Sequence, residues 1–136
     1  MKIDKVNTSF ILNDYNLTIQ KIYNDIQELY PFETLISYSN FIERLYTDFI
    51  FIKNKYHNQY KMLNKLVIGN PYTFVYPYKK TNRTLVYNVV FLGSIHIESH
   101  NILDCANICV FSAKSSVKND YCAIQLNKLN LIKEIK

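Results

Sequence analysis

A long helical pattern in the first half of the chain constrains the fold more than any other feature. Apolar side chains recur every three or four positions from Leu35 to Val67, without a proline or glycine between them. This spacing places them on one face of a helix, and we predict a helix over residues 32–67. An unbroken helix of this length would measure about 50 Å, which exceeds the roughly 28–30 Å diameter expected for a domain of this size. We therefore expect the helix either to break near residues 57–59 or to project from the body.

A shorter pattern of the same kind precedes it. Apolar residues at alternating spacings of three and four predict a first helix over residues 13–30. Asn13 or Asp14 can cap its start, because a short polar side chain accepts from the unpaired N–H groups there. Pro31 ends it. The short connection to the next helix predicts an antiparallel helical hairpin.

After Pro71 the hydrophobic period changes from helical to two, which is typical of strands. Gly93 permits a tight bend or a bulge between two strands, and Pro77 makes the first strand an edge strand or ends it early. Helices followed by strands predict an α+β fold, with a helical hairpin before a four- to five-stranded antiparallel sheet. We interpret residues 1–136 as a single domain. The strands are predicted over residues 72–78, 84–92, 94–100, 107–113 and 121–131.

The number of cysteines and the absence of long uncharged runs favour a cytoplasmic protein. Cys105, Cys109 and Cys122 are odd in number, whereas a secreted disulfide framework is usually even. The first residues lack a signal-peptide pattern, and no uncharged run reaches the roughly 18 residues of a membrane span. We therefore predict a cytoplasmic protein without a membrane partner. Its abundance of Asn, Ile, Lys and Tyr also fits an AT-rich genome.

The leading hypothesis for function is a non-enzymatic protein that binds another protein or a second copy of itself. The long apolar stripe is the candidate interface, and an assembly subunit or an inhibitor or immunity-type protein of a mobile element or pathogen would fit it. The competing interpretation is that the stripe packs against the chain's own sheet, as amphipathic helices of single domains usually do. The candidate interface residues are Leu45, Phe49, Ile52, Tyr56 and Tyr60.

The alternative hypothesis is a nucleic-acid-binding protein or small RNase that uses a basic and aromatic hairpin. Residues 69–136 hold eight Lys and Arg against four Asp and Glu, so most of the net charge of +5 lies there. Bases can stack on tyrosine rings while cations contact phosphates. The competing interpretation is that the rings form the inner face of the sheet. The candidate contacts are Tyr76, Tyr78, Lys79, Lys80 and Arg83.

One short pattern could carry metal or acid–base chemistry. His96, Glu98 and His100 lie on one face of a predicted strand, and two imidazoles with a carboxylate can bind zinc or ferrous iron. The two histidines could also act as the acid–base pair of an RNase. Alternation of a half-exposed strand explains the same pattern. The sequence holds no nucleotide-binding or hydrolase motif, so we expect no cofactor and no catalytic residue.

Overall fold

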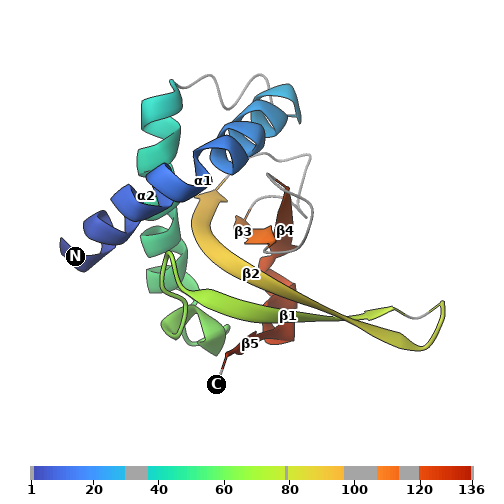
Figure 1. The fold of residues 1–136 in the computed structure, drawn as a ribbon. Helices are drawn as coiled ribbons and strands as arrows, with labels where there is room; N and C mark the ends of the chain where they lie inside the picture. Colours follow the sequence, from blue (N-terminus) through green and yellow to red (C-terminus); the bar gives the residue numbers. More distant parts are fainter. Residues whose placement is uncertain (1, 30–36, 79, 97–106, 114–119, 136) are drawn as a thin grey trace.

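The computed structural model describes residues 2–29, 37–78, 80–96, 107–113 and 120–135 (Figure 1). Two helices precede a five-stranded antiparallel sheet, which confirms the predicted α+β fold. The elements in chain order are α1 (Lys2–Leu29), α2 (Tyr38–Tyr56), the 3-10 helix η1 (Lys61–Asn64), β1 (Pro71–Tyr78), β2 (Arg83–His96), β3 (Asn107–Ala113), β4 (Tyr121–Gln125), the 3-10 helix η3 (Leu126–Leu131) and β5 (Ile132–Glu134).

Helix α2 forms the main contact between helices and sheet. Ser37 caps its start, because the Ser37 hydroxyl accepts from the Asn40 N–H at 3.2 Å. The Phe49 ring packs edge-on against Phe91 of β2, with centroids 4.8 Å apart. The predicted stripe therefore faces the chain's own core. The buried residues of α2 are Leu45, Phe49 and Ile52, which belong to the predicted stripe, and Phe41, which does not.

Helix α2 is shorter than the sequence pattern predicted. It ends at Tyr56 and not at residue 67, at the position where a break was considered. The backbone N–H of His57 donates to the Lys53 carbonyl at 3.0 Å, and His57 Nδ1 lies 3.1 Å from the same oxygen. Leu63 is buried from η1 rather than from a helix that continues. The apolar spacing thus outlasts the helix, because a tight turn also buries residues three apart.

Helix α1 begins before the predicted start at residue 13. It runs from Lys2 to Leu29, with a kink at Tyr15 (φ −122°, ψ 22°). Asn13 and Asp14 precede the kink, and such side chains compete for backbone groups and so disfavour a helix interior. Beyond the kink, Ile19, Ile22 and Ile26 are buried. No helix in the described ranges is both long and apolar enough to cross a membrane.

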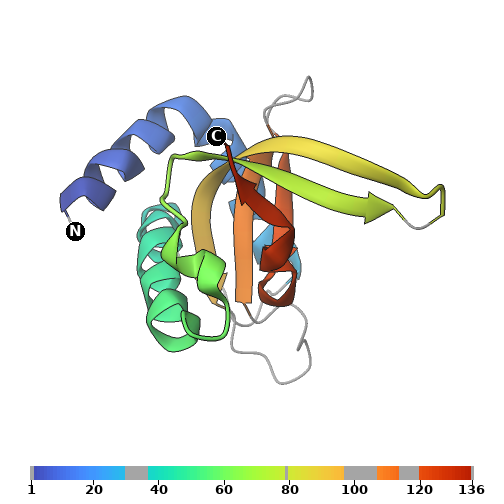
Figure 2. The same cartoon turned by 90° about the horizontal axis from the view of Figure 1, so that it is seen from below.

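The sheet has the strand order β4-β3-β2-β1-β5, so β4 and β5 are its two edges. Helix η3 connects these edges with six residues, which rise about 12 Å at 2.0 Å each. The edges of a flat sheet of five strands would lie about 19 Å apart. The sheet is therefore strongly curved, and the bend is clearest in β2 (Figures 1 and 2).

The prediction of separate strands over residues 84–92 and 94–100 is wrong, because β2 is one strand from Arg83 to His96. Gly93 does not end it. Its φ of +126° creates a bulge, and the pairing with β3 shifts register between Phe91 and Gly93. A Cβ atom at Gly93 would lie 2.6 Å from the Leu45 carbonyl oxygen, so glycine lets α2 approach the strand closely. Residues 97–100 lie outside the described ranges.

The prediction of one last strand over residues 121–131 is also wrong. Strand β4 ends at Gln125, and the chain then forms η3. Leu126 and Leu129 are both buried, because side chains three apart lie on the same side of a 3-10 helix. The chain then forms β5, whose Glu134 pairs with Tyr72 of β1.

Candidate functional site

The outer parts of β1 and β2 extend beyond the rest of the sheet as a two-stranded arm. We define the arm as residues 75–78 and 80–88. Strand β5 pairs with β1 only at residues 72–74, and β3 pairs with β2 only from Val89 onward. Within the described ranges, the arm therefore has no neighbouring strand on either side. Figures 1 and 2 show it projecting from the body.

Both faces of the arm carry exposed apolar side chains. Tyr76 pairs across the strands with Leu85, and Val75 pairs with Val86 on the opposite face. Two-stranded ribbons are marginally stable alone, and contiguous exposed apolar surface is typical of interaction sites. The exposed fractions are 43% for Tyr76, 40% for Tyr78, 36% for Leu85, 62% for Val86 and 36% for Tyr87.

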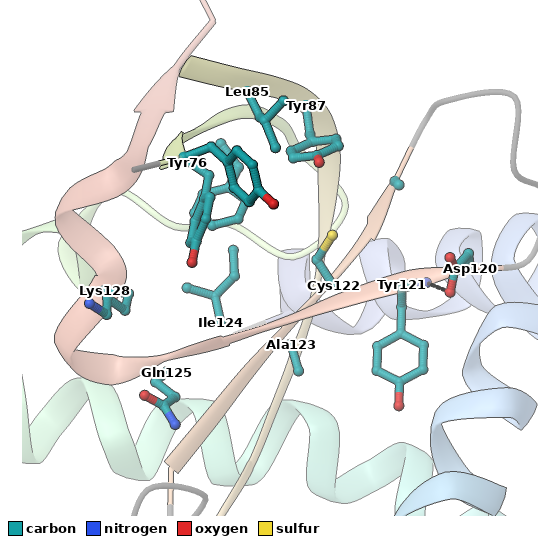
Figure 3. A pocket seen from close by; sticks show the side chains of 13 residues that line it. Tyr76, Leu85, Tyr87, Asp120, Tyr121, Cys122, Ala123, Ile124, Gln125 and Lys128 are labelled. Atoms are coloured by element: carbon teal, nitrogen blue, oxygen red, sulfur yellow. Dashed lines mark hydrogen bonds between the residues drawn. The ribbon is translucent and has the colours of Figure 1, made fainter. Parts of the chain in front are cut away.

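A cavity of about 680 Å³ lies between the arm and β4. Its arm side consists of the rings and aliphatic chains that share one face of β1 and β2. Figure 3 shows the Tyr76 and Tyr87 rings on this side and Ile124 on the side of β4. The Phe74 and Tyr87 rings stack with centroids 6.3 Å apart, which fixes the inner end of the aromatic wall.

Polar groups lie at the ends of the cavity. Lys128 of η3 lines it and forms no ion pair with another described residue. The Asp120 carboxylate accepts from Lys21 at 3.1 Å and from the Tyr121 N–H at 2.9 Å. The hydrogen bond from Lys21, followed by that from the Tyr121 backbone, lowers the pKa of Asp120. Since Asp120 is already paired, Lys128 is the cation available to a bound group.

Tyr121 lines the cavity, but its hydroxyl and its ring both interact with side chains of α1. Its hydroxyl donates to the Asp25 carboxylate at 2.8 Å, and Lys21 lies 5.9 Å from its ring centroid. Burial first, and then the hydrogen bond to Asp25, raises the pKa of Tyr121. Tyr121 therefore stays protonated and joins α1 to the sheet.

The charges of the arm are confined to its turn. No Asp or Glu occurs between residues 71 and 88, and the only cations are Lys79, Lys80 and Arg83. Asn82 turns the chain with a φ of 53°. Lys80 and Arg83 are exposed, so the tip is basic while the strands beyond it are uncharged.

The structure corrects the predicted interface on the long helix. Leu45 and Phe49 are each 4% exposed and Ile52 is fully buried, so these three side chains offer no surface to a partner. They pack against the chain's own sheet. Tyr56 and Tyr60 are partly buried, and their rings contact edge-on with centroids 6.3 Å apart.

The predicted nucleic-acid contacts lie on the arm. Tyr76, Tyr78, Lys80 and Arg83 are exposed, and Lys79 lies outside the described residues. Four aromatic side chains lie on one face of β1, and they differ in burial. The inner rings, Tyr72 and Phe74, are buried as the competing interpretation predicted, while the outer rings are not.

Of the three predicted metal residues, only His96 lies in the described part of the chain. The His96 ring stacks on Phe51 with centroids 5.2 Å apart. The His96 backbone is held by α2: its N–H donates to Asp48 at 2.8 Å and its carbonyl accepts from Arg44 at 2.6 Å. Glu98 and His100 lie outside the described residues. The described residues hold no group of three or more metal-binding side chains.

The described cysteines are protected by burial. Cys109 is fully buried beside Ser94, and burial raises the pKa of its thiol to about 12. Cys122, which lines the cavity, is half-buried, and burial, with Asp120 as the second cause, raises its pKa too. Both thiols therefore stay protonated near neutral pH, a poor state for nucleophilic chemistry. Cys105 lies outside the described residues.

Sequence reasoning proposed this hairpin as a nucleic-acid-binding surface, but it missed the exposed Leu85, Val86 and Tyr87 and the projection of the hairpin beyond the sheet. The prediction from Pro77 that β1 is an edge strand is wrong for the sheet, in which β1 lies between β2 and β5. Within the described residues it holds only for the outer part of β1, which contains Pro77 and lies beyond the pairing with β5. The pattern could not show that β3 would stop pairing at Val89. No protein-family model, curated protein or solved structure matches the chain.

Proposed function

We propose that this protein acts by binding another protein through the β1–β2 arm. The observation that carries the proposal is the exposure of apolar side chains on both faces of the arm, from Tyr76 and Leu85 on one face to Val86 on the other. Tyrosine suits such a role because it combines a large apolar ring with a polar tip. The basic turn favours a partner surface that is acidic next to Lys80 and Arg83.

The distribution of charge favours a protein over a nucleic acid. A nucleic-acid strand carries one phosphate per nucleotide, so a groove that follows it needs cations along its length. Apart from Arg83, the first residue of β2, the strands of the arm are uncharged, and the cations cluster at the turn. Leu85 and Val86 add aliphatic surface, which suits protein side chains better than nucleobases.

Single-stranded nucleic acid remains the second candidate, because the arm lacks any acidic residue and exposes three tyrosine rings beside Lys80 and Arg83. Stacking on such rings contributes about 1–3 kcal/mol per base. If the partner is a nucleic acid, affinity should fall steeply as the salt concentration rises. Binding releases cations from the phosphates, and this release favours binding less when the solution already contains many cations. A protein complex held by apolar contacts expects a much weaker dependence.

Site-specific photo-cross-linking in the cells that produce the protein tests the proposal. We would replace Tyr76 or Val86, one on each face of the arm, with a benzophenone amino acid. Gln20, exposed on α1, is the matched control. We expect a discrete protein adduct from the arm positions and none from Gln20.

A further substitution links the adduct to the apolar surface. Tyr87→Asp adds a charge to the face of the arm that carries Tyr76 and Leu85. If the partner contacts both faces, this charge is expected to abolish the adduct formed from Val86 on the opposite face. Adducts that disappear on nuclease treatment would support the second candidate instead. Equal labelling from Gln20 and from the arm would contradict both.

A further inference from the structure

The backbone of β2 has a defined orientation along the arm. The Gly69 N–H donates to the Phe91 carbonyl at 2.8 Å, and the Phe91 N–H donates to the Asn70 carbonyl at 3.1 Å. The polar groups of Phe91 therefore point toward the β1 side. In a strand, both backbone groups of a residue point to the same neighbour, and the direction alternates along the chain. The pairing of β1 with β2 has no register shift from Pro71 to Tyr78.

The alternation identifies which residues face away from β1. Counting back from Phe91, the backbone groups of Tyr87 and Leu85 face β1, and those of Val86 face outward, as do those of Thr84 and Asn88. The prolines of β1 agree with this assignment. Pro71 pairs with Val90 and Pro77 with Thr84, which are positions where β1 needs no N–H toward β2.

This outward edge of β2 has no partner strand among the described residues. Strand β3 covers β2 only from Val89 onward, so no strand in the described ranges pairs with residues 83–88. The edge contains no proline. The outer edge of β1 differs, because β5 pairs with its inner part and Pro77 removes a donor from its outer part. One edge of the arm can therefore accept another strand, and the other is poorly suited to it.

We propose that an extended segment of a protein partner adds antiparallel to β2 along residues 83–88. This inference rests on the proposed function and specifies how its partner binds. The antiparallel direction is favoured because it gives the more stable pairing. Alternate side chains of the segment enter the cavity beside Leu85 and Tyr87, which is the way that added strands are recognised elsewhere.

Charge complementarity sets the chemistry of the segment. Since β2 runs from Arg83 at the tip toward the body, an antiparallel segment ends at the tip. Its C-terminal end therefore lies beside Arg83 and Lys80, which have no acidic residue near them in the arm sequence. We infer a segment with apolar residues two positions apart, followed by Asp or Glu.

The test uses displayed peptides of nine random residues, selected against the full-length protein. Val86→Pro removes one outward N–H and keeps the N–H groups that bond β1. Val86→Ala removes most of the side chain and keeps that N–H. We expect selected peptides to share the inferred pattern and to bind Val86→Pro at least tenfold more weakly than Val86→Ala, because both variants lose the valine side chain and only the proline variant also loses the outward N–H.

A measurement on the unmodified protein removes the question of whether Val86→Pro folds. Methylating the backbone nitrogens of a selected peptide one at a time removes its donors in turn. If the peptide pairs with β2, methylation weakens binding at every second position only. A uniform effect along the peptide would overturn the inference.

The remaining outcomes separate this inference from the proposed function. Peptides that lose affinity for Tyr76→Ser but bind Val86→Pro normally would show binding to the face of the arm; the inference fails and the proposed function stands. A concentration-dependent dimer that Val86→Pro abolishes would place a second copy on the edge and overturn the inference. Selection of no peptide, together with salt-sensitive binding of polyuridylate, would overturn both.

Discussion

The two halves of β2 both contain apolar side chains but have opposite environments. All seven residues from Val89 to Ile95 are buried, and all six residues from Arg83 to Asn88 are exposed. Both halves are rich in apolar and β-branched residues. The inner half lies between β1 and β3 and beneath α2, whereas among the described residues the outer half pairs with β1 alone. Hydrophobic character therefore does not decide burial here; the number of neighbouring elements does.

This difference divides the strand into a part that stabilises the fold and a part that is available for binding. An apolar side chain in the inner half contributes to the free energy of unfolding through burial. One in the outer half contributes little, because water already contacts it in the folded state. Substitutions in the two halves should therefore have separable effects on stability and on binding.

The largest contrast is expected between Phe91→Ala and Tyr87→Ala. Phe91 is fully buried against Phe49 and Phe111, so its removal should lower the free energy of unfolding by about 3–5 kcal/mol. Tyr87→Ala should cost less than about 1 kcal/mol. Urea denaturation followed by circular dichroism measures both. Similar losses for the two variants would contradict the division of β2.

The next largest effect is expected at the bulge. Gly93→Ala places a Cβ atom 2.6 Å from the Leu45 carbonyl oxygen and at a φ of +126° that other residues rarely adopt. We expect a loss of about 2–4 kcal/mol. Asn88→Ala, at the exposed end of the same strand, is the control and should change stability by less than about 0.5 kcal/mol. A stable Gly93→Ala variant would show that α2 can move away from β2.

A smaller effect is expected where α2 holds the end of the inner half. Asp48 accepts from the His96 N–H at 2.8 Å and from Arg44 at 2.9 Å. Asp48→Ala leaves both donors without this acceptor, and we expect a loss of about 1–3 kcal/mol. Glu43, exposed on the same helix, provides the control Glu43→Ala. Thermal unfolding of the two variants measures the difference.

The smallest effect concerns pH and the thiol beside the inner half. Burial raises the pKa of Cys109 to about 12, so above about pH 9 the unfolded chain releases this proton while the folded chain keeps it. Stability from this group is present below pH 9 and is lost as the pH rises toward 12. We expect wild type to lose about 1 kcal/mol more than Cys109→Ala between pH 8 and pH 10. Parallel curves for the two proteins would place the thiol in contact with water.

Periodicity in the sequence predicted which residues would be buried better than it predicted where elements end. The stripe through Leu45, Phe49 and Ile52 is real and buried. It continued past Tyr56 because a turn can bury residues at the same spacing as a helix. At Gly93 the sequence allows a bend or a bulge, and the structure has a bulge within one strand; a sequence does not show which of the two a glycine forms.

The candidate site was only partly predictable, for a reason that lies in the pairing of strands. Tyr76 and Tyr78 are predicted as binding residues, yet they are aromatic residues two positions apart, as the buried Tyr72 and Phe74 are. What separates the two pairs is that β5 reaches β1 only at residues 72–74. That pairing joins segments about sixty positions apart, which local patterns cannot show.

The link between β4 and β5 through η3 also has a kinetic consequence. Strand β1 gains its second neighbour only when β5 returns across the curved sheet, and Lys21 of α1 reaches Asp120, 99 positions away, to join the helices to β4. Closing such loops costs entropy before the contacts that reward it can form. Refolding should therefore be slow for a chain of this length, with the β1–β2 hairpin forming early and the edges of the sheet assembling last.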